Sequence, residues 1–386
     1  MMVRGGAGSG TLSPVNHPAP TAADGAVPHA TPGTATALAA VLVEQGRPLE
    51  FRRVPLPVLA AGEALVRVTA CSVCGSDLHT AHGRRPHVVP TILGHEIVGT
   101  IAGLGPGPPV RDVGGEPLTV GDRVTWSVCA SCGACDRCRR GLPQKCRSLV
   151  KYGHAALESR HGLSGGLADH VHLVPGTAIV RLPAGLSEVA AAPASCAVAT
   201  AAAIVRHAGD IRGRSVLVLG AGMLGVSVAS LARARGAGGV TLVDPQADRL
   251  ERAARAAPGC RVATQAFVDD DGVDGFDLVV EAGGAPASVT AALDLVATGG
   301  TCVLAGTVSP VGTVPFDPER AVRRQVVIHG VHNYRPEDLV AAVAHLAGPH
   351  GAALAALVGP VFPLDRVREA LEVAASGAAL RVVVTP

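Results

Sequence analysis

The pattern of hydrophobic residues divides the chain near residue 197. Residues 38–125 hold short apolar runs, such as ALAAVLVE, ALVRVTA and IVGTIAGLG, which glycines and prolines separate. Short runs bounded by turn residues are typical of β-strands, so this part predicts a small β-barrel-like domain. Similar runs resume over residues 165–182, after a cysteine-rich stretch.

From about residue 197 apolar strands alternate with helical stretches. SVLVLG (215–220) is a continuous apolar run of the kind that forms a buried parallel strand. The stretch MLGVSVASLARARG then predicts a helix, and GVTLVD (239–244) predicts a second strand. Further units of the same kind follow, so this part predicts a doubly wound α/β fold with a parallel sheet.

These patterns predict four segments. We expect residues 1–35, a Pro/Gly/Ala/Thr segment with little to bury, to be disordered. A β-rich domain is expected over 36–196, with a cysteine lobe at 126–150. The doubly wound domain should cover 197–330, and residues 331–386 should return to the first domain. The longest apolar stretch is too short for a membrane span, and the N-terminal residues show no secretory signal.

Composition excludes several classes of partner. Charged residues make up 17% of the chain and hydrophobic residues 48%, as in a soluble globular enzyme. A net charge of +2 and 2% aromatic residues argue against nucleic acid and anionic membranes as partners. The ten cysteines cluster by metal-ligand spacing, so we expect reduced thiols and a cytoplasmic location.

Four of these cysteines lie within 15 residues and are spaced C-x2-C-x2-C-x7-C. They are Cys132, Cys135, Cys138 and Cys146. Four thiolates this close can form a tetrahedral shell around one Zn²⁺. A closed shell leaves no open coordination position, so the spacing predicts a structural zinc and directs attention to a second, open site elsewhere.

A glycine motif, GAGMLG (220–225), follows the predicted strand and opens a helix. An acidic residue, Asp244, stands 19 residues after the last glycine, which is the context a dinucleotide site requires. The glycines allow the backbone to approach a pyrophosphate, and a carboxylate on the ribose hydroxyls favours NAD over NADP. Arg249 is the one neighbour that could weaken this preference, and a structural glycine turn is the alternative. The candidate coenzyme residues here are Gly220, Gly222, Met223, Leu224, Gly225, Asp244 and Arg249.

A second set of candidate metal ligands lies in the first domain, where CGSDLH (74–79) is followed by GHE (94–96). A catalytic zinc needs three protein ligands and an open position. Cys74 and His95 are the natural first two, and Cys196, just ahead of the nucleotide strand, is the best candidate for the third. Each residue alone could equally be a buried thiol or a core histidine.

With these motifs, the chain resembles the zinc-dependent medium-chain alcohol dehydrogenases over about residues 38–386. That family combines a GroES-like catalytic domain with a Rossmann coenzyme domain. The resemblance implies that Cys74, His95 and Cys196 hold the catalytic zinc; polyol dehydrogenase relatives carry Glu at the third position. It also implies two zinc ions per chain, NAD(H), a small alcohol or aldehyde as substrate, and a homodimer or homotetramer.

The resemblance further implies roles for residues near the metal. Glu96 is the carboxylate that can approach zinc, and Asp77 should orient His95. Arg381 sits where the family places an arginine on the coenzyme pyrophosphate, with an exposed strand-end charge as the alternative. Zinc is expected to lower the pKa of the substrate hydroxyl. The proton should then leave through Ser76 and the coenzyme ribose to His79, while hydride passes to the nicotinamide.

A set of cations near the ligand segments bears on the substrate. It contains Arg84, Arg85 and His87 shortly after His79, and Lys151 with His154. The candidate substrate residues among them are Arg84, Arg85, Lys151 and His154. Grouped cations suit a phosphonate or phosphate, and CGSDLHTAHGRRP, GLPQKC and KYGH look like a subgroup associated with phosphonate metabolism. A solvated charged face is the alternative explanation for the cations.

The sequence thus predicts an oxidoreductase that transfers hydride between NAD and an alcohol, with a hydroxyalkyl phosphonate as the specific candidate. A polyol or aminocyclitol dehydrogenase, acting on a compound such as 2-deoxy-scyllo-inosamine, is the alternative within the family. A non-enzymatic or zinc-independent relative is the alternative from another class. Such relatives usually lack the zinc ligands that this chain carries.

Overall fold

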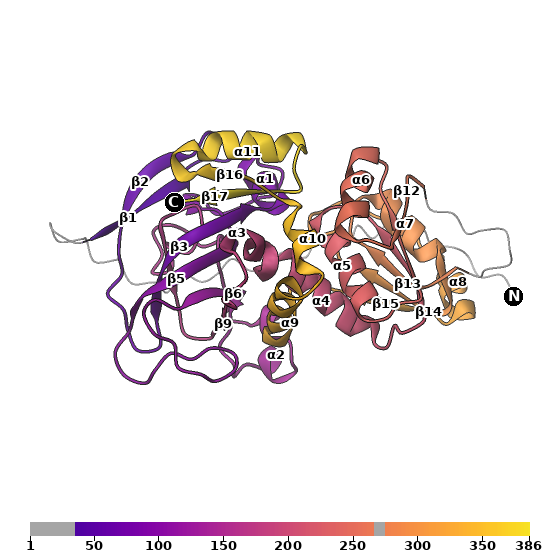
Figure 1. Cartoon of the computed structure of the whole chain (residues 1–386), viewed down its shortest axis with the longest axis horizontal. Coiled ribbons are helices and arrows are strands. Elements are labelled where there is room, and N and C mark those ends of the chain that lie inside the picture. Colours follow the sequence, from indigo (N-terminus) through magenta and orange to yellow (C-terminus); the bar gives the residue numbers. More distant parts are fainter. Residues whose placement is uncertain (1–34, 266–274) are drawn as a thin grey trace, which may run out of the picture.

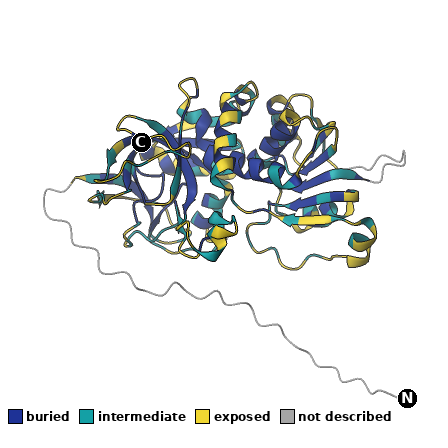
Figure 2. Cartoon of the chain, turned by 90° about the horizontal axis from the view of Figure 1, so that it is seen from below, coloured by how far each residue is buried: buried dark blue, intermediate teal, exposed yellow. Residues whose placement is uncertain are grey.

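The computed structural model describes residues 35–265 and 275–386, which form two lobes beside one another (Figure 1). The predicted disordered tail, residues 1–35, lies outside the described residues except for Ala35. Buried residues are concentrated inside each lobe (Figure 2). The predicted α/β class, with one β-rich and one doubly wound domain, is therefore confirmed.

The first lobe is built on an eight-stranded sheet in the order β16-β17-β3-β5-β6-β7, with β8 on β3 and β9 on β6. A three-stranded sheet, β2-β1-β4, lies beside it. The strands from the first part of the chain are β1 (Thr36–Leu42), β2 (Glu50–Pro55), β3 (Ala64–Val73), β4 (Thr91–Ile92), β5 (Glu96–Leu104), β6 (Arg123–Ala130), β7 (Val150–Lys151), β8 (His170–Leu173) and β9 (Thr177–Arg181). In β3 the buried Val66 and Val68 flank the exposed Arg67, the alternation expected of a strand with one face on the core.

The second lobe holds a six-stranded, all-parallel sheet in the order β12-β11-β10-β13-β14-β15. Its strands are β10 (Ser215–Leu219), β11 (Gly239–Val243), β12 (Arg261–Ala263), β13 (Phe276–Glu281), β14 (Val296–Leu304) and β15 (Val327–Gly330). Its helices are α5 (Met223–Ala234), α6 (Ala247–Ala256), α7 (Pro286–Asp294) and α8 (Pro318–Arg324). The strand order reverses at β10, so a crevice opens at the carboxyl ends of β10 and β13, where such folds bind ligands.

Several elements lie at the junction of the lobes. They are α3 (Glu188–Ala191), the 3₁₀ turn η2 (Ala192–Ser195), α4 (Ala197–Ala208), α9 (Pro336–Ala347) and α10 (Gly351–Ala355). The largely buried α4 packs against α5 and α9, and Arg206 pairs with Asp338 through two bonds of 2.8 Å. The chain then enters the sheet of the first lobe through β16 (Val358–Pro363), α11 (Val367–Ser376) and β17 (Arg381–Thr385). The domain boundaries given at 196 and 331 stay predictions.

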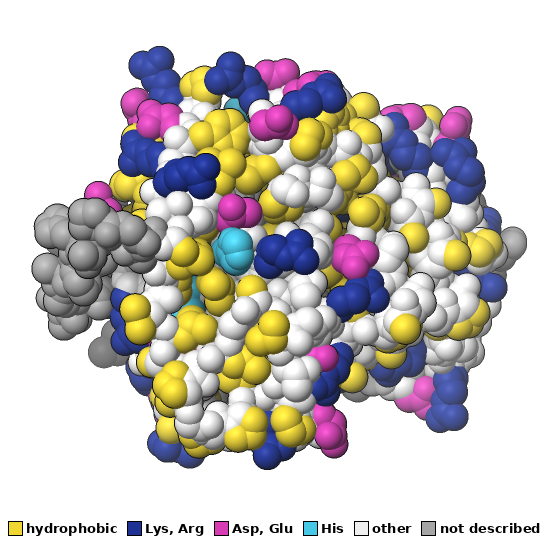
Figure 3. Space-filling view, turned by 60° about the vertical axis from the view of Figure 1, so that its left-hand side comes forward, with side chains coloured by type: hydrophobic (Ala, Val, Ile, Leu, Met, Phe, Trp, Pro, Cys, Tyr) yellow, Lys and Arg dark blue, Asp and Glu magenta, His cyan; other side chains and the backbone are white. Residues whose placement is uncertain are grey.

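The surface and the helices bear on the expected partners. Basic and acidic side chains are interspersed over the face seen in Figure 3, without a broad patch of one sign there. In the part of the chain that the structure describes, no single helix is both long and apolar enough to cross a membrane. One bent pair, Glu188–Ser195 with Ala197–Ala208, passes by length and composition alone.

Candidate functional site

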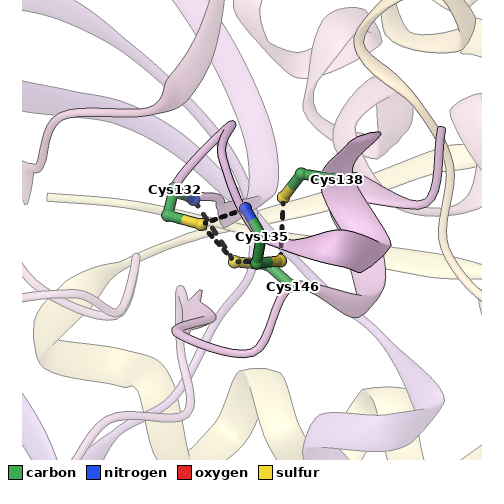
Figure 4. Close-up of side chains that lie close together, drawn as sticks. All are labelled: Cys132, Cys135, Cys138 and Cys146. Atoms are coloured by element: carbon green, nitrogen blue, oxygen red, sulfur yellow. Dashed lines mark hydrogen bonds between the residues drawn. The ribbon is translucent and has the colours of Figure 1, made fainter. Parts of the chain in front are cut away.

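The four-cysteine lobe forms one compact cluster around α2 (Asp136–Arg139) and the turn η1 (Pro143–Lys145) (Figure 4). Neighbouring sulfurs lie 3.4 Å apart for Cys132 and Cys146, 3.5 Å for Cys135 and Cys138, and 3.9 Å for Cys135 and Cys146. A tetrahedron with Zn–S bonds of about 2.3 Å has edges of about 3.8 Å, so the cluster fits one zinc ion. Backbone N–H groups, first that of Arg147, lower the pKa of Cys135 to about 6, which favours the thiolate that a metal requires.

A second cluster joins Cys74, His95 and Cys196, whose ligand atoms all lie within 4.8 Å of one another. Cys74 precedes α1 (Gly75–Ala81), His95 precedes β5, and Cys196 stands between η2 and α4. A hydrogen bond from Cys196 lowers the pKa of Cys74 well below its usual value, against the opposing effect of burial. Two thiols and one imidazole form the donor set of a three-ligand zinc site. The two clusters therefore imply two zinc ions per chain, one structural and one catalytic.

Strand register brings these ligands together. Val382 of β17 is paired with Val73 of β3, and Ser72 of β3 is paired with Glu96 of β5. The residues at the ends of these three strands therefore meet at one edge of the sheet. The turn η2 packs on β3 and β5, and the Ser195 hydroxyl donates to the His95 carbonyl at 3.3 Å. This contact places Cys196 beside His95.

Asp77 holds both ligand segments. Its side chain is 2% exposed. Its Oδ1 accepts hydrogen bonds from His95 Nδ1 at 3.1 Å and from the Gly94 N–H at 3.2 Å, and its Oδ2 accepts from the Cys74 N–H at 2.9 Å. Because Nδ1 faces the carboxylate, Nε2 of His95 is left for the metal. These contacts support the predicted orienting role of Asp77.

Arg381 and Glu96 form a buried pair beside Cys74. Arg381 Nε lies 2.8 Å from Glu96 Oε2, and its Nη2 lies 3.0 Å from Glu96 Oε1 and 3.6 Å from the Cys74 sulfur. Ser72 also donates to Glu96, which is fully buried. Arg381 is only 9% exposed, so it is not an exposed strand-end charge. Its guanidinium is occupied by Glu96, and a contact with pyrophosphate stays a prediction.

A cavity of about 580 Å³ lies between the lobes and unites the predicted site. From the first lobe it is lined by Cys74, Ser76, His79, His95 and Cys196. From the second lobe it is lined by Leu224 and by residues 282–285 and 305–306. The metal ligands and the carboxyl ends of the parallel strands therefore face the same space.

The glycine motif fits a dinucleotide. Gly220 has φ +111°, and a Cβ there would lie 2.8 Å from the Gly283 nitrogen. At Gly225 a Cβ would lie 1.8 Å from the Gly220 carbonyl oxygen, so these two glycines are required by packing. At Gly222, which caps α5, a Cβ would meet no protein atom within 4 Å. The space above Gly222 is thus open to a phosphate group at the helix N-terminus.

Asp244 is the residue directly after β11, and its side chain lies next to this motif. Its Oδ2 accepts a hydrogen bond from the Ala221 N–H, and its Oδ1 accepts one from the Gln246 N–H, both at 2.9 Å. Arg249 Nη1 lies 3.8 Å from Asp244 Oδ2. Asp244 is therefore in contact with Arg249, the residue predicted to weaken its preference for NAD.

The predicted proton relay is partly assembled. The Ser76 hydroxyl lies 3.3 Å from His95 Nε2, so it stands beside the metal position. His79 lines the same cavity, and burial, followed by the Arg84 charge, lowers its pKa from 6.5. Within the described residues no hydrogen bond joins Ser76 to His79, and a coenzyme ribose bridge between them stays a prediction.

Three of the four predicted substrate cations line the cavity: Arg84, Arg85 and Lys151. The loop after α1 that carries the arginines is anchored by Gln45 Nε2, which donates to the Thr80 and Arg85 carbonyls. His154 is not part of the lining. Its Nδ1 lies 2.9 Å from the Tyr152 carbonyl oxygen and its ring is 5.4 Å from that of His95, so the structure gives no support to a substrate contact.

Sequence reasoning missed the segment 331–334, where the chain leaves β15. Tyr334 is buried, and its hydroxyl donates to the Ser195 carbonyl and accepts from the Val128 N–H at 3.0 Å. His332 lines the cavity and contacts Lys145 of the cysteine lobe. A usable signal was the rarity of tyrosine, since the chain has two, and one lies four residues after the last strand of the parallel sheet.

Comparisons with known proteins agree with this geometry. Residues 60–184 match the alcohol dehydrogenase GroES-like domain, and residues 191–385 match the glucose dehydrogenase C-terminus. The 5-exo-hydroxycamphor dehydrogenase of Pseudomonas putida is 31% identical over 90% of this chain and 98% of its own length. An alcohol dehydrogenase structure from Thermotoga maritima superposes with a TM-score of 0.85 at 27% identity, covering 91% of this chain and all 100% of that one. A putative zinc-binding dehydrogenase from Sinorhizobium meliloti, bound to NADP, gives a TM-score of 0.77 at 26% identity and covers 92% and 100%.

Proposed function

Because the chain belongs to the zinc-dependent medium-chain alcohol dehydrogenase family, we propose that it transfers hydride between NAD and an alcohol that carries an anionic group. The chain is a zinc-dependent NAD(P) alcohol or polyol dehydrogenase; the choice of NAD and of an anionic substrate is the proposal. One observation carries it: the metal ligands, the loops after β13 and β14, and the three predicted substrate cations Arg84, Arg85 and Lys151 line a single cavity.

Each group at the site has a distinct task. Zinc held by Cys74, His95 and Cys196 would supply Lewis-acid polarisation of the substrate oxygen, and NAD would accept the hydride. We expect the Ser76 hydroxyl, which lies 3.3 Å from His95 Nε2, to take the substrate proton. His79, whose lowered pKa keeps it neutral near pH 7, can receive that proton at the cavity wall.

The charge of the cavity favours an anionic substrate. Among the described residues, no acidic side chain lines it, and no ion pair neutralises Arg84, Arg85 or Lys151. Burial lowers the pKa of Lys151, and the nearby Arg85 charge acts in the same direction, against the opposing effect of the Cys129 thiolate. A guanidinium binds a carboxylate or phosphonate through two parallel hydrogen bonds. A neutral polyol would leave these charges without a partner.

The test compares substrates in wild type, Arg84→Ala and Arg85→Ala. The panel contains 2-hydroxyethylphosphonate, a hydroxycarboxylate, a neutral diol and a cyclitol. A lost charged hydrogen bond contributes about 1.5–3 kcal/mol, so kcat/KM for the anionic substrate should fall by about 10-fold or more, while the diol is little affected. Arg53→Ala, on the exposed strand β2, is the matched control.

Two outcomes would count against the proposal. Equal losses on charged and neutral substrates would make the arginines structural. A wild-type preference for the diol or cyclitol would favour the polyol alternative. The phosphonate-metabolism subgroup finds no support among the relatives reported above, so the phosphonate and the hydroxycarboxylate enter the panel on equal terms.

NAD is favoured over NADP by Asp244. A 2′-phosphate would be placed against a buried carboxylate whose oxygens already accept two backbone N–H groups. Arg249, at 3.8 Å, is the one described cation that could offset this repulsion. We expect a higher kcat/KM for NAD, a weaker preference in Asp244→Ala and a stronger one in Arg249→Ala. Equal kcat/KM values for the two coenzymes in wild type would contradict the assignment.

Assembly and location are also proposals. The edge strand β15 exposes Val327 and Ile328, and an exposed apolar edge favours pairing with a second copy. Light scattering on wild type and Ile328→Lys measures whether a homodimer depends on this edge. All ten cysteines are unpaired, which supports the proposed reducing, cytoplasmic location.

A further inference from the structure

Glu281, the last residue of β13, is a buried carboxylate that the reaction chemistry leaves unused. It is 0% exposed, and within the described residues no cation pairs with it. Burying a charge in this way is costly unless hydrogen bonds satisfy its oxygens. Five donors do so: the Gly283 N–H at 2.8 Å, the Gly284 N–H, the Ser288 hydroxyl at 2.8 Å, and the Gly306 N–H and Thr307 hydroxyl, both at 3.1 Å.

Four of these donors come from two different loops, and the fifth, Ser288, lies in the first turn of α7. Oε1 binds the loop after β13, and Oε2 binds the loop after β14. The loops touch backbone to backbone, because a Cβ at Gly306 would lie 2.5 Å from the Ala282 carbonyl carbon. A Cβ at Gly284 would in turn lie 2.7 Å from the Gly306 oxygen. One carboxylate therefore fixes both loops relative to each other.

The two loops form the cavity wall between the glycine motif and the metal ligands. Residues 282–285 and 305–306 line the cavity together with Cys74 and Cys196. On the other side, a Cβ at Gly220 would lie 2.8 Å from the Gly283 nitrogen, so the first loop also adjoins the phosphate-binding turn. A dinucleotide with its phosphates at α5 must extend along this wall for its reactive ring to reach the metal site.

We propose that Glu281 is a positioning residue for the nicotinamide half of the coenzyme, acting through the two loops that it holds. Its oxygens are filled by five donors, so it does not itself contact the coenzyme. The adenosine half depends on the motif at 220–225 and on Asp244, and among the described residues none of the hydrogen bonds of the Glu281 side chain goes to either. This inference rests on the proposed use of a nicotinamide coenzyme.

The test is Glu281→Gln, which is nearly isosteric but turns an amide N–H₂ toward the donors of one loop. Calorimetry on the full-length, zinc-loaded protein measures the Kd of NADH and of ADP-ribose, which lacks nicotinamide. An unsatisfied buried donor is expected to weaken NADH binding by about 10-fold, while ADP-ribose binding stays within about twofold. Asp277→Asn is the matched control. It is the same chemical change at the other end of β13, where Oδ2 accepts from the Ser215 N–H and hydroxyl, both at 2.8 Å.

If Glu281→Gln weakens the binding of NADH and of ADP-ribose to the same extent, the substitution loosens the whole lobe and the proposal is overturned. Unchanged NADH binding would also overturn it. If Glu281→Gln does not fold, Thr307→Val removes a single donor, and the same selective loss of NADH is expected on a smaller scale. A wild type that binds neither NADH nor ADP-ribose would instead refute the proposed coenzyme use. The two failures are therefore distinguishable.

Discussion

Replacing Asp77 by asparagine should loosen the catalytic zinc and leave the structural zinc in place. The buried carboxylate accepts from His95 Nδ1, from the Gly94 N–H and from the Cys74 N–H. Asparagine has one acceptor oxygen, so its amide N–H₂ must face either the His95 side or the Cys74 side. In either orientation a donor is set against a donor next to a metal ligand.

The magnitude follows from the partners. Losing a hydrogen bond to a charged group costs about 1.5–3 kcal/mol. Removing the residue that orients a metal-binding histidine typically weakens metal affinity by about 10–100-fold, which corresponds to about 1.4–2.7 kcal/mol. The two figures agree, so we expect a loss of zinc affinity within this range at the site of Cys74, His95 and Cys196.

Competition with a chromophoric chelator measures this loss, and the four-cysteine site serves as the internal control. Wild type should release its two zinc ions with two different affinities. Asp77→Asn should weaken the binding of only the ion that activity requires. Asp210→Asn, at the exposed ion pair with Arg212, controls for the change of charge. Unchanged affinity in Asp77→Asn, or equal weakening of both classes, would refute the reasoning.

Two further predictions concern the other site and the proton relay. Cys135→Ser should lower the melting temperature and the structural zinc content, because the four-cysteine lobe has few apolar residues to hold it without metal; lost kcat at an unchanged melting temperature would contradict a structural role. Burial and then Arg84 lower the pKa of His79 from 6.5, and a base must be unprotonated to accept the substrate proton. With a neutral alcohol, kcat/KM should therefore fall on the acid side with an apparent pKa below 6.5, and this apparent pKa should rise in Arg84→Gln. An unchanged apparent pKa would exclude an effect of Arg84 on His79.

The parts of the site that the sequence predicts are those encoded over short distances. The four cysteines fall within 15 residues, and Asp77 lies three residues from Cys74, so local spacing alone brings each group close to its partners. The glycine motif is similar, because a strand, a turn and a helix are consecutive in the chain. The third ligand, Cys196, was a candidate only together with Cys74 and His95, since nothing in its own alanine-rich surroundings marks it as a ligand.

The remaining features depend on pairings between distant segments. Glu281 resembles any acidic residue at a strand end until the loop after β14, 25 residues later, donates to it. Arg381 was placed near the coenzyme by resemblance, but its partner Glu96 is 285 residues away. His154 was grouped with Lys151 by proximity in sequence, yet Lys151 lines the cavity and His154 does not, although its ring lies 5.4 Å from that of His95. Sequence spacing does not report on which side of a turn a side chain lies.

Hydride transfer requires the coenzyme loops and the metal ligands to keep a fixed separation, and these parts belong to different lobes. The segment 331–334 meets this requirement directly. At its start the Val331 N–H donates to the Leu304 carbonyl of β14 at 3.0 Å, which ties it to the parallel sheet. At its end the Tyr334 hydroxyl binds the Ser195 carbonyl, the residue before the ligand Cys196. A four-residue crossing therefore links the strand that bears one Glu281-bound loop to the segment that carries Cys196.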